Sequence, residues 1–209
     1  MHNVEEDQMI NWAEVNTWLA SEESVADVSN GYYSRRSPLH PGAFTMRETA
    51  VAVPLDALGG AVLDLGCGCG TWLLYLRDRG VPCYGVDRSE EAVAVANKLL
   101  INHGHTARAR VGDLRKQTDK WGLVTAFAVL YDVYPTQDGM LDYLRELMLP
   151  SGWLALEYYV DQEPRIEGRG YLSVEAMVLH AKAHGLEVVS VTTRQTKEHE
   201  NALYVFRRA

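Results

Sequence analysis

The sequence predicts a three-layer α/β fold whose sheet is mostly parallel, with a reversed final strand and an N-terminal helical cap. From residue 61 onward, short apolar segments alternate with amphipathic segments of helical length, which is the pattern of βαβ units and of a parallel sheet. The last two apolar segments are joined by too few residues for a crossover helix, so we expect these two strands to pair antiparallel or to lie apart. In such a sheet, ligands bind at the carboxyl ends of the parallel strands.

The expected strands are short apolar runs bounded by glycine, proline or polar residues. They are residues 62–65, 83–87, 107–111, 123–130, 153–160, 186–193 and 202–207. The expected helices are residues 71–79, 90–103, 140–149 and 173–184. Ser89 is placed to cap the second helix at its amino end, and Gly80 and Gly185 are placed to end the first and the last.

The first 60 residues have a different pattern and are expected to cover the sheet. Residues 5–20 predict an amphipathic helix, residues 29–42 predict a loop rich in glycine, proline and arginine, and residues 44–58 predict a second helix that a proline limits. We therefore expect N-terminal helices and a lid loop in residues 1–60 and the binding domain in residues 61–209. Together they should form one compact domain, because a domain takes roughly 150 residues.

Composition and charge disfavour several classes of protein. Twenty Lys and Arg against 28 Asp and Glu leave a net charge of −8, whereas a nucleic-acid partner would need a basic face. No apolar stretch is long enough to span a bilayer, and the amino-terminal residues lack the pattern of a signal peptide, so no membrane partner is expected. Three cysteines do not make a secreted disulfide framework, so we expect a cytoplasmic protein. The oligomeric state is not indicated by the sequence.

A glycine cluster follows the first expected strand, at residues 66–70, where the chain reads Gly-Cys-Gly-Cys-Gly. Glycines at alternate positions let the backbone turn tightly and let a ligand approach it closely. The dinucleotide fingerprint GxGxxG would place Gly or Ala at Thr71, so a nicotinamide-dependent oxidoreductase is the least favoured function. We interpret Cys67 and Cys69 as small residues beside a ligand, and expect no metal site because no further Cys or His lies near them.

Three aspartates lie at or near the ends of the first three strands. Asp87 ends the second strand, where a carboxylate can accept hydrogen bonds from both hydroxyls of a ribose. Asp113 follows the third strand, where a carboxylate can accept from an adenine amino group. Asp64, in the first strand, could balance the charge of a cationic ligand. Together with the glycines, these acids predict a nucleoside site.

From residue 61 to its end, the sequence resembles the class I S-adenosylmethionine-dependent methyltransferases, whose fold is Rossmann-like. Residues 62–70 read Val-Leu-Asp-Leu-Gly-Cys-Gly-Cys-Gly and look like the first motif of this family, and residues 149–153 resemble its Leu-x-Pro-Gly-Gly turn. The chain departs from the family at residues 121–122, where Trp-Gly stands in place of the frequent Tyr-Asp or Phe-Asp pair. A narrower likeness is to the small tellurite-resistance and thiopurine-type group.

The resemblance implies that S-adenosylmethionine is the cofactor and S-adenosylhomocysteine the product. It implies that the glycines line the methionine and ribose portions, that Asp87 holds the ribose diol, and that Asp113 contacts the adenine. The segment that begins at Val129 would lie beside the sulfonium. The expected cofactor-binding residues are Asp64, Gly66, Cys67, Gly68, Gly70, Asp87, Arg88, Asp113, Leu114, Val129 and Leu130.

The activity implied by the resemblance is in-line transfer of a methyl group to O, N or S of a small molecule. Holding the nucleophile, the methyl carbon and the sulfur on one line can be worth on the order of 7–11 kcal/mol. A thiol needs little more, whereas an alcohol or amine needs a group that takes its proton. The alternatives are an RNA or protein methyltransferase, and a protein of this fold that binds the cofactor without transferring methyl, as a binding subunit or in a cyclisation.

Residues at the carboxyl edge of the sheet are the candidates for catalysis and substrate binding. The expected catalytic residues are Tyr131, Asp132 and His199, the last because the unperturbed pKa of histidine lies near neutrality. The expected substrate and lid residues are Tyr32, Tyr33, Arg36, Tyr158, Tyr159 and Arg194. The first three of these lie on a glycine-punctuated loop that could close over the site and exclude water. His180 and His184 are expected at the surface, away from this edge.

Overall fold

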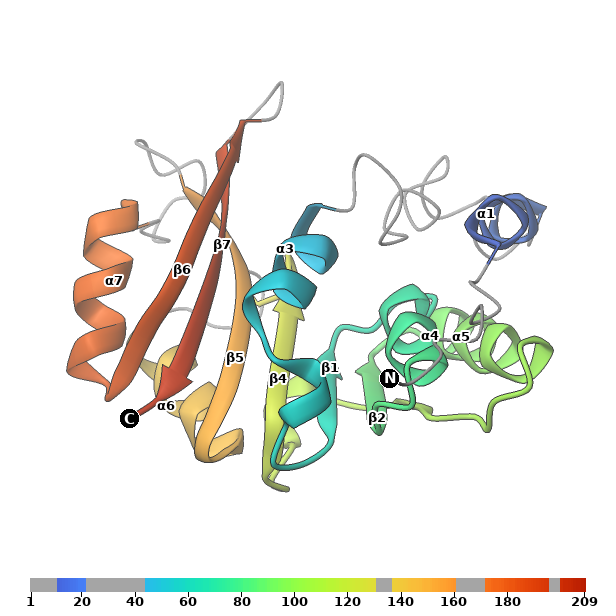
Figure 1. Ribbon diagram of the computed structural model, residues 1–209, viewed down its shortest axis with the longest axis horizontal. Coiled ribbons are helices and arrows are strands. Elements are labelled where there is room, and N and C mark those ends of the chain that lie inside the picture. Colours follow the sequence, from blue (N-terminus) through green and yellow to red (C-terminus); the bar gives the residue numbers. More distant parts are fainter. Residues whose placement is uncertain (1–10, 22–43, 131–136, 161–171, 196–199) are drawn as a thin grey trace, which may run out of the picture.

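A computed structural model describes residues 11–21, 44–130, 137–160, 172–195 and 200–209 of the chain. These residues contain a seven-stranded sheet with strand order β3-β2-β1-β4-β5-β7-β6. Its strands are β1 (Val62–Leu65), β2 (Cys83–Asp87), β3 (Ala109–Val111), β4 (Trp121–Phe127), β5 (Met148–Val160), β6 (Leu186–Gln195) and β7 (Glu200–Arg208). Figure 1 shows the sheet, with α7 and β6 at one end and α5 at the other.

The expected reversed final strand is confirmed. Strands β1 to β5 pair in parallel, whereas β7 is antiparallel to both of its neighbours, β5 and β6. The last strand in the chain is therefore not the last strand in the sheet, because it inserts between β5 and β6. As a result, β6 runs in the same direction as β5, and its carboxyl end lies at the same edge as the ends of the other parallel strands.

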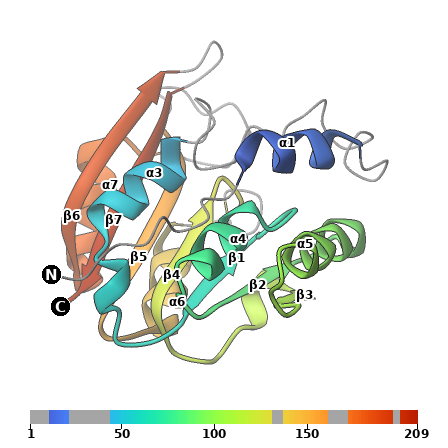
Figure 2. The same cartoon turned by 45° about the vertical axis from the view of Figure 1, so that its right-hand side comes forward.

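Helices cover both faces of the sheet (Figure 2). On one face lie α3 (Phe44–Ala52), α4 (Thr71–Asp78) and α5 (Glu90–Asn102), with α1 (Trp12–Ser21) packed beyond them. On the other face lie α6 (Gln137–Leu147) and α7 (Val174–Ala183). Two short 3-10 helices, η2 (Leu55–Ala57) and η3 (Leu114–Lys116), lie in connections between these elements.

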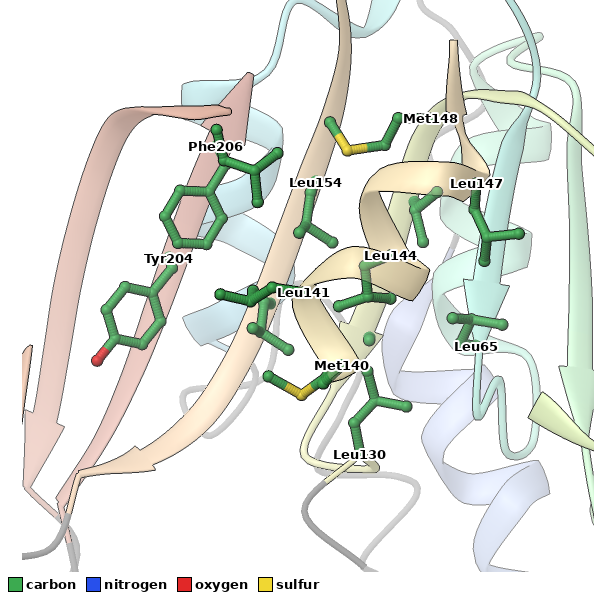
Figure 3. Close-up of a cluster of buried hydrophobic side chains, with 14 of the residues drawn as sticks. Leu65, Leu130, Met140, Leu141, Leu144, Leu147, Met148, Leu154, Tyr204 and Phe206 are labelled. Atoms are coloured by element: carbon green, nitrogen blue, oxygen red, sulfur yellow. The ribbon is translucent and has the colours of Figure 1, made fainter. Parts of the chain in front are cut away.

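Each face has its own apolar core, because side chains alternate along a strand. On the α6 face, Met140, Leu141 and Leu144 pack against Leu154 of β5 and Phe206 of β7 (Figure 3). On the α4 face, a second cluster joins residues of α3, α4 and α5 to the sheet. This three-layer arrangement confirms the fold class and fixes the carboxyl edge of the sheet as the place where loops can build a site.

Several boundaries differ from those expected. Strand β4 ends at Phe127 rather than at residue 130, because Ala128 takes a positive φ of 53° that interrupts the extended backbone. The expected helix at residues 44–58 is divided: α3 ends at Ala52, and η2 follows Pro54. The turn expected at residues 149–153 lies inside the bounds of β5, where Ser151 has a φ of 59° and the register with β4 shifts.

The helix-capping residues predicted from the sequence are confirmed, whereas two histidines of α7 and its end are less exposed than expected. The Ser89 hydroxyl accepts from the Ala92 amide at 3.1 Å, which caps α5. Gly80 and Gly185, which follow α4 and α7, both have positive φ. His180 and His184 are half-buried rather than exposed, and His184 Nδ1 lies 2.6 Å from Asp142 Oδ1, which joins α7 to α6.

Candidate functional site

The turn after β1 takes a conformation that depends on glycine. Gly66, Gly68 and Gly70 have φ values of 74°, 52° and 79°, in the left-handed region that other residues rarely adopt. A Cβ on Gly66 would come within 2.5 Å of Val129 Cγ2, and one on Gly70 within 2.8 Å of the Ala96 Cβ. The first glycine therefore lets the segment after β4 lie close to this turn, and the last lets α4 pack against α5.

Asp87, at the carboxyl end of β2, holds this glycine turn in place. Its Oδ2 accepts from the Gly68 amide at 2.9 Å, and its Oδ1 accepts from the Ser89 amide at 3.0 Å. The side chain is half-buried. Because each carboxylate oxygen has two lone pairs, both oxygens can still accept a hydrogen bond from a ligand hydroxyl.

Asp64 lies one strand away and is 4% exposed. Its Oδ1 accepts from the Thr125 hydroxyl at 2.7 Å, because β1 and β4 pair these two residues in register. The negative charges of Asp64 and Asp87 act on Cys67: burial raises the pKa of this thiol well above its ordinary value, and the two carboxylates raise it further. The thiol therefore stays protonated and neutral beside the two acids.

Asp113 lies at the amino end of η3, and its carboxylate is paired with Arg115. Its Oδ1 accepts from the Arg115 amide at 2.9 Å and from Nε at 3.1 Å, and its Oδ2 accepts from Nη2 at 2.9 Å. Hydrogen bonds from the Arg115 side chain and backbone lower the pKa of Asp113 to about 2. An adenine amino group could use only the lone pairs that Arg115 leaves, a constraint that the sequence did not indicate.

Two adjoining cavities lie at the carboxyl edge of the sheet, with volumes of about 630 Å³ and 180 Å³. The larger is lined by Asp87, Arg88, Val111, Gly112, Asp113, Leu114, Arg115, Ala128 and Val129. The smaller is lined by Met46, Asp64, Gly66, Cys67, Gly68, Cys69, Thr71, Asp87, Arg88, Phe127, Ala128 and Val129. They share Asp87, Arg88, Ala128 and Val129, so they form one elongated site.

Most of the residues predicted to bind a cofactor meet in this site. The exceptions are Gly70, which packs against α5, and Leu130, which is fully buried in the cluster on the α6 face. Seven lining residues were not predicted: Met46 of α3, Thr71 of α4, Val111 of β3, Gly112, Arg115 of η3, Phe127 of β4 and Ala128. Nothing in the local sequence marks Met46, because its place in the site depends on how α3 packs on the sheet.

The predicted catalytic and substrate residues are only partly described. Tyr32, Tyr33, Arg36, Tyr131, Asp132 and His199 lie outside the described residues. The Tyr158 side chain is 5% exposed and packs in the cluster on the α6 face. Tyr159 and Arg194 lie at the carboxyl ends of β5 and β6, where each pairs in register with β7 at Asn201.

Tyr159 and Arg194 therefore share the opposite face of the sheet, where α3 lies. The Arg194 guanidinium lies 5.2 Å from the centre of the Phe44 ring of α3, close enough for a cation–π contact. Strand alternation, which has a period of two, separates Tyr158 from Tyr159 although they are neighbours in sequence.

Comparisons with known proteins agree with this geometry. A family model described as a methyltransferase domain matches residues 40–193, and no curated protein matches the chain significantly. A magnesium protoporphyrin IX methyltransferase from Synechocystis PCC 6803, solved with bound SAM, is 17% identical over 100% of both chains with a TM-score of 0.67.

Two further solved structures share the fold. A SAM-dependent methyltransferase from Geobacter sulfurreducens in complex with S-adenosyl-L-homocysteine is 17% identical, covers 83% of this chain and 93% of its own, and has a TM-score of 0.67. A TehB-like SAM-dependent methyltransferase from Corynebacterium glutamicum is 20% identical, covers 79% of this chain and 87% of its own, and has a TM-score of 0.57.

The fold and the site thus define a class I S-adenosylmethionine-dependent methyltransferase, as the resemblance in sequence indicated. The chain belongs to the family of methyltransferase domains whose model it matches. Within the ranges that the structure describes, no helix is both long and apolar enough to cross a membrane.

Proposed function

We propose that this methyltransferase transfers the methyl group of S-adenosylmethionine to O, N or S of a small molecule. The observation that carries this proposal is the pair of adjoining cavities, in which predicted cofactor residues from β1, β2, β3 and β4 meet at one edge of the sheet. A small-molecule acceptor also agrees with the net charge of −8, which disfavours nucleic acid, and with the similar magnesium protoporphyrin IX methyltransferase.

The residues present fit this cofactor, with the nucleoside in the larger cavity. There Asp87 would accept from the ribose hydroxyls, while Asp113 and the backbone of Leu114 would contact the adenine. The methionine portion would lie in the smaller cavity, beside the glycine turn and the buried charge of Asp64, which favours a cationic group. The sulfonium would then lie where the cavities meet, at Ala128 and Val129.

Bound in this way, the cofactor supplies a methyl group that is already activated for displacement. The work of the chain is to hold the acceptor in line with that methyl group and to exclude water from it. Tyr131, Asp132 and His199 remain proposed as catalytic residues, and residues 1–60 as N-terminal helices with a lid loop, beside a binding domain at 61–209. A cytoplasmic location belongs to the same proposal.

The test is to incubate the purified protein with methyl-labelled S-adenosylmethionine and separate fractions of small molecules, RNA and protein. We expect labelled products in the small-molecule fraction alone. The Asp87→Ala variant is the control, because it should bind the cofactor poorly and form little product. Label found only in RNA or protein would contradict the proposed substrate class. Tight cofactor binding with label in no fraction would favour the non-transferring alternative.

A further inference from the structure

A buried carboxylate lies one strand away from the site and lines neither of its cavities. Glu157, near the carboxyl end of β5, is 7% exposed. It pairs in register with Phe127 of β4 on one side and with Leu203 of β7 on the other. Acidic side chains are rarely buried to this extent unless a partner compensates the lost hydration. Packing in the apolar core therefore does not explain why an acidic residue stands at this position.

Strand alternation directs Glu157 toward the α3 face of the sheet. Its flanking residues Leu156 and Tyr158 pack in the cluster on the α6 face, whereas Phe127, Ala155 and Leu203 belong to the cluster on the α3 and α4 face. Phe127 also lines the smaller cavity. Since paired strands lie about 4.8 Å apart, Glu157 is one strand spacing from the wall of that cavity.

Hydrogen bonding around Glu157 is incomplete. Among the described residues, its carboxylate has one hydrogen-bond partner, the Asn201 amide, whose Nδ2 donates to Oε1 at 3.1 Å. The Asn201 Oδ1 is buried and accepts no hydrogen bond in this part of the chain. Two acceptor groups, a carboxylate and an amide oxygen, thus lie together at the edge of the sheet with more acceptor capacity than the described residues fill.

We propose that Glu157 accepts the proton of the methyl acceptor, which is therefore an amine or an alcohol, phenols included, rather than a thiol. This inference rests on the proposed function and names the substrate class of that site. The lone pair of N or O forms the bond to the methyl carbon, and the methyl–sulfur bond breaks with its electron pair remaining on sulfur. The N–H or O–H proton passes to the Glu157 carboxylate, and when the acceptor is a primary amine its second N–H donates to Asn201 Oδ1.

The test uses Glu157→Gln, which keeps the shape of the side chain and its contact with Asn201 but removes the proton acceptor. The probes are a set of amines, alcohols, phenols and thiols, together with a small-molecule extract of the source organism, each incubated with labelled S-adenosylmethionine. We expect kcat for amine and alcohol acceptors to fall by at least about 100-fold, the usual lower bound for lost acid–base catalysis, with KM changed little. Affinity for S-adenosylhomocysteine should stay unchanged.

Two further variants complete the design. Glu187→Gln makes the same chemical change on an exposed residue near the amino end of β6 and should behave as the wild type. Glu157→Asp keeps the charge and should retain about 10-fold more activity than Glu157→Gln, which a merely structural role would not produce. If Glu157→Gln does not fold, the comparison of Glu157→Asp with Asn201→Ala replaces it, and both should slow amine or alcohol methylation.

Two results would overturn the inference alone: equal rates of amine or alcohol methylation in Glu157→Gln and the wild type, or a wild-type protein that methylates only thiols. Absence of labelled product from every acceptor with the wild type would instead overturn the proposed function, and the inference with it. The two failures are therefore distinguishable from the wild-type reactions.

Discussion

The backbone N–H of Gly68 donates a hydrogen bond of 2.9 Å to Oδ2 of Asp87, and this bond joins the glycine turn after β1 to the end of β2. The other oxygen of the same carboxylate accepts from the Ser89 amide, at the residue that caps α5. One side chain thus holds two loops and also lines both cavities. A residue predicted as a cofactor contact is therefore also part of the scaffold of the site.

Replacing Asp87 should separate binding from folding. We expect Asp87→Ala to weaken affinity for S-adenosylhomocysteine by at least about 100-fold, because hydrogen bonds to charged groups are worth about 1.5–3 kcal/mol each. The fold should remain, since the side chain is only half-buried. Isothermal titration calorimetry measures the affinity, and circular dichroism checks the fold. Asp87→Asn keeps one oxygen for the Gly68 amide and should lose less affinity; unchanged affinity in Asp87→Ala would contradict the ribose assignment.

Gly66→Ala should destabilise the protein through two separate effects. The new Cβ would lie 2.5 Å from Val129 Cγ2, and the backbone would keep a φ of 74° that alanine adopts poorly. Left-handed backbone costs about 1–2 kcal/mol and overpacking about 1–3 kcal/mol, so we expect the free energy of unfolding to fall by about 2–5 kcal/mol. Urea denaturation measures it.

A double variant divides these two effects. Adding Val129→Ala removes Cγ1 and Cγ2, of which Cγ2 makes the closest contact, but leaves the Val129 Cβ at 2.9 Å and the backbone strain. The Gly66→Ala change should therefore cost less in the Val129→Ala background, by part of the overpacking cost of about 1–3 kcal/mol. Equal costs in both backgrounds would show that the two methyl groups of Val129 are not the cause.

The pKa of the Asp113 carboxyl should depend on Arg115. In the folded protein the pKa of Asp113 is lowered to about 2 from an ordinary value of 3.8, chiefly by the Arg115 side chain. A carboxyl whose pKa is lowered by folding stabilises the folded state at any pH above its ordinary pKa. This contribution is lost as the pH falls from about 4 toward 2. In Arg115→Leu, the Asp113 carboxyl resonance should titrate closer to its ordinary pKa by NMR. Lys116→Leu, a lesser influence on the same carboxylate, should move the titration less; a midpoint unaffected by Arg115→Leu would contradict the pairing.

Local patterns in the sequence predicted the fold class and much of the cofactor site. The glycine turn and Asp113 follow β1 and β3, Asp87 ends β2, and the ends of parallel strands meet at one edge of the sheet. These residues could therefore be predicted to lie together from local patterns alone, without information on long-range contacts. The short connection between the last two strands likewise predicted the reversed strand, because it leaves no room for a crossover.

Contacts between distant residues were decided only by the tertiary structure. No local pattern indicates that β7 inserts between β5 and β6, yet this insertion brings Asn201 to Glu157. Tyr158 and Tyr159 were both predicted as substrate residues because both lie at the end of the same strand. In the structure, side chains alternate along β5, and Tyr158 packs in the apolar core on the α6 face.

What the sequence by itself determined is the order of strands, turns and carboxylates, because each of these depends on backbone geometry and on burial over a few residues. Which strands become neighbours, which side chains share a face, and which carboxylate is paired in the folded state depend on packing between segments far apart in the chain. The contact between Asn201 of β7 and Glu157 of β5 is such a pair. Its free energy arises only when β7 has inserted beside β5, so only the tertiary structure determines it.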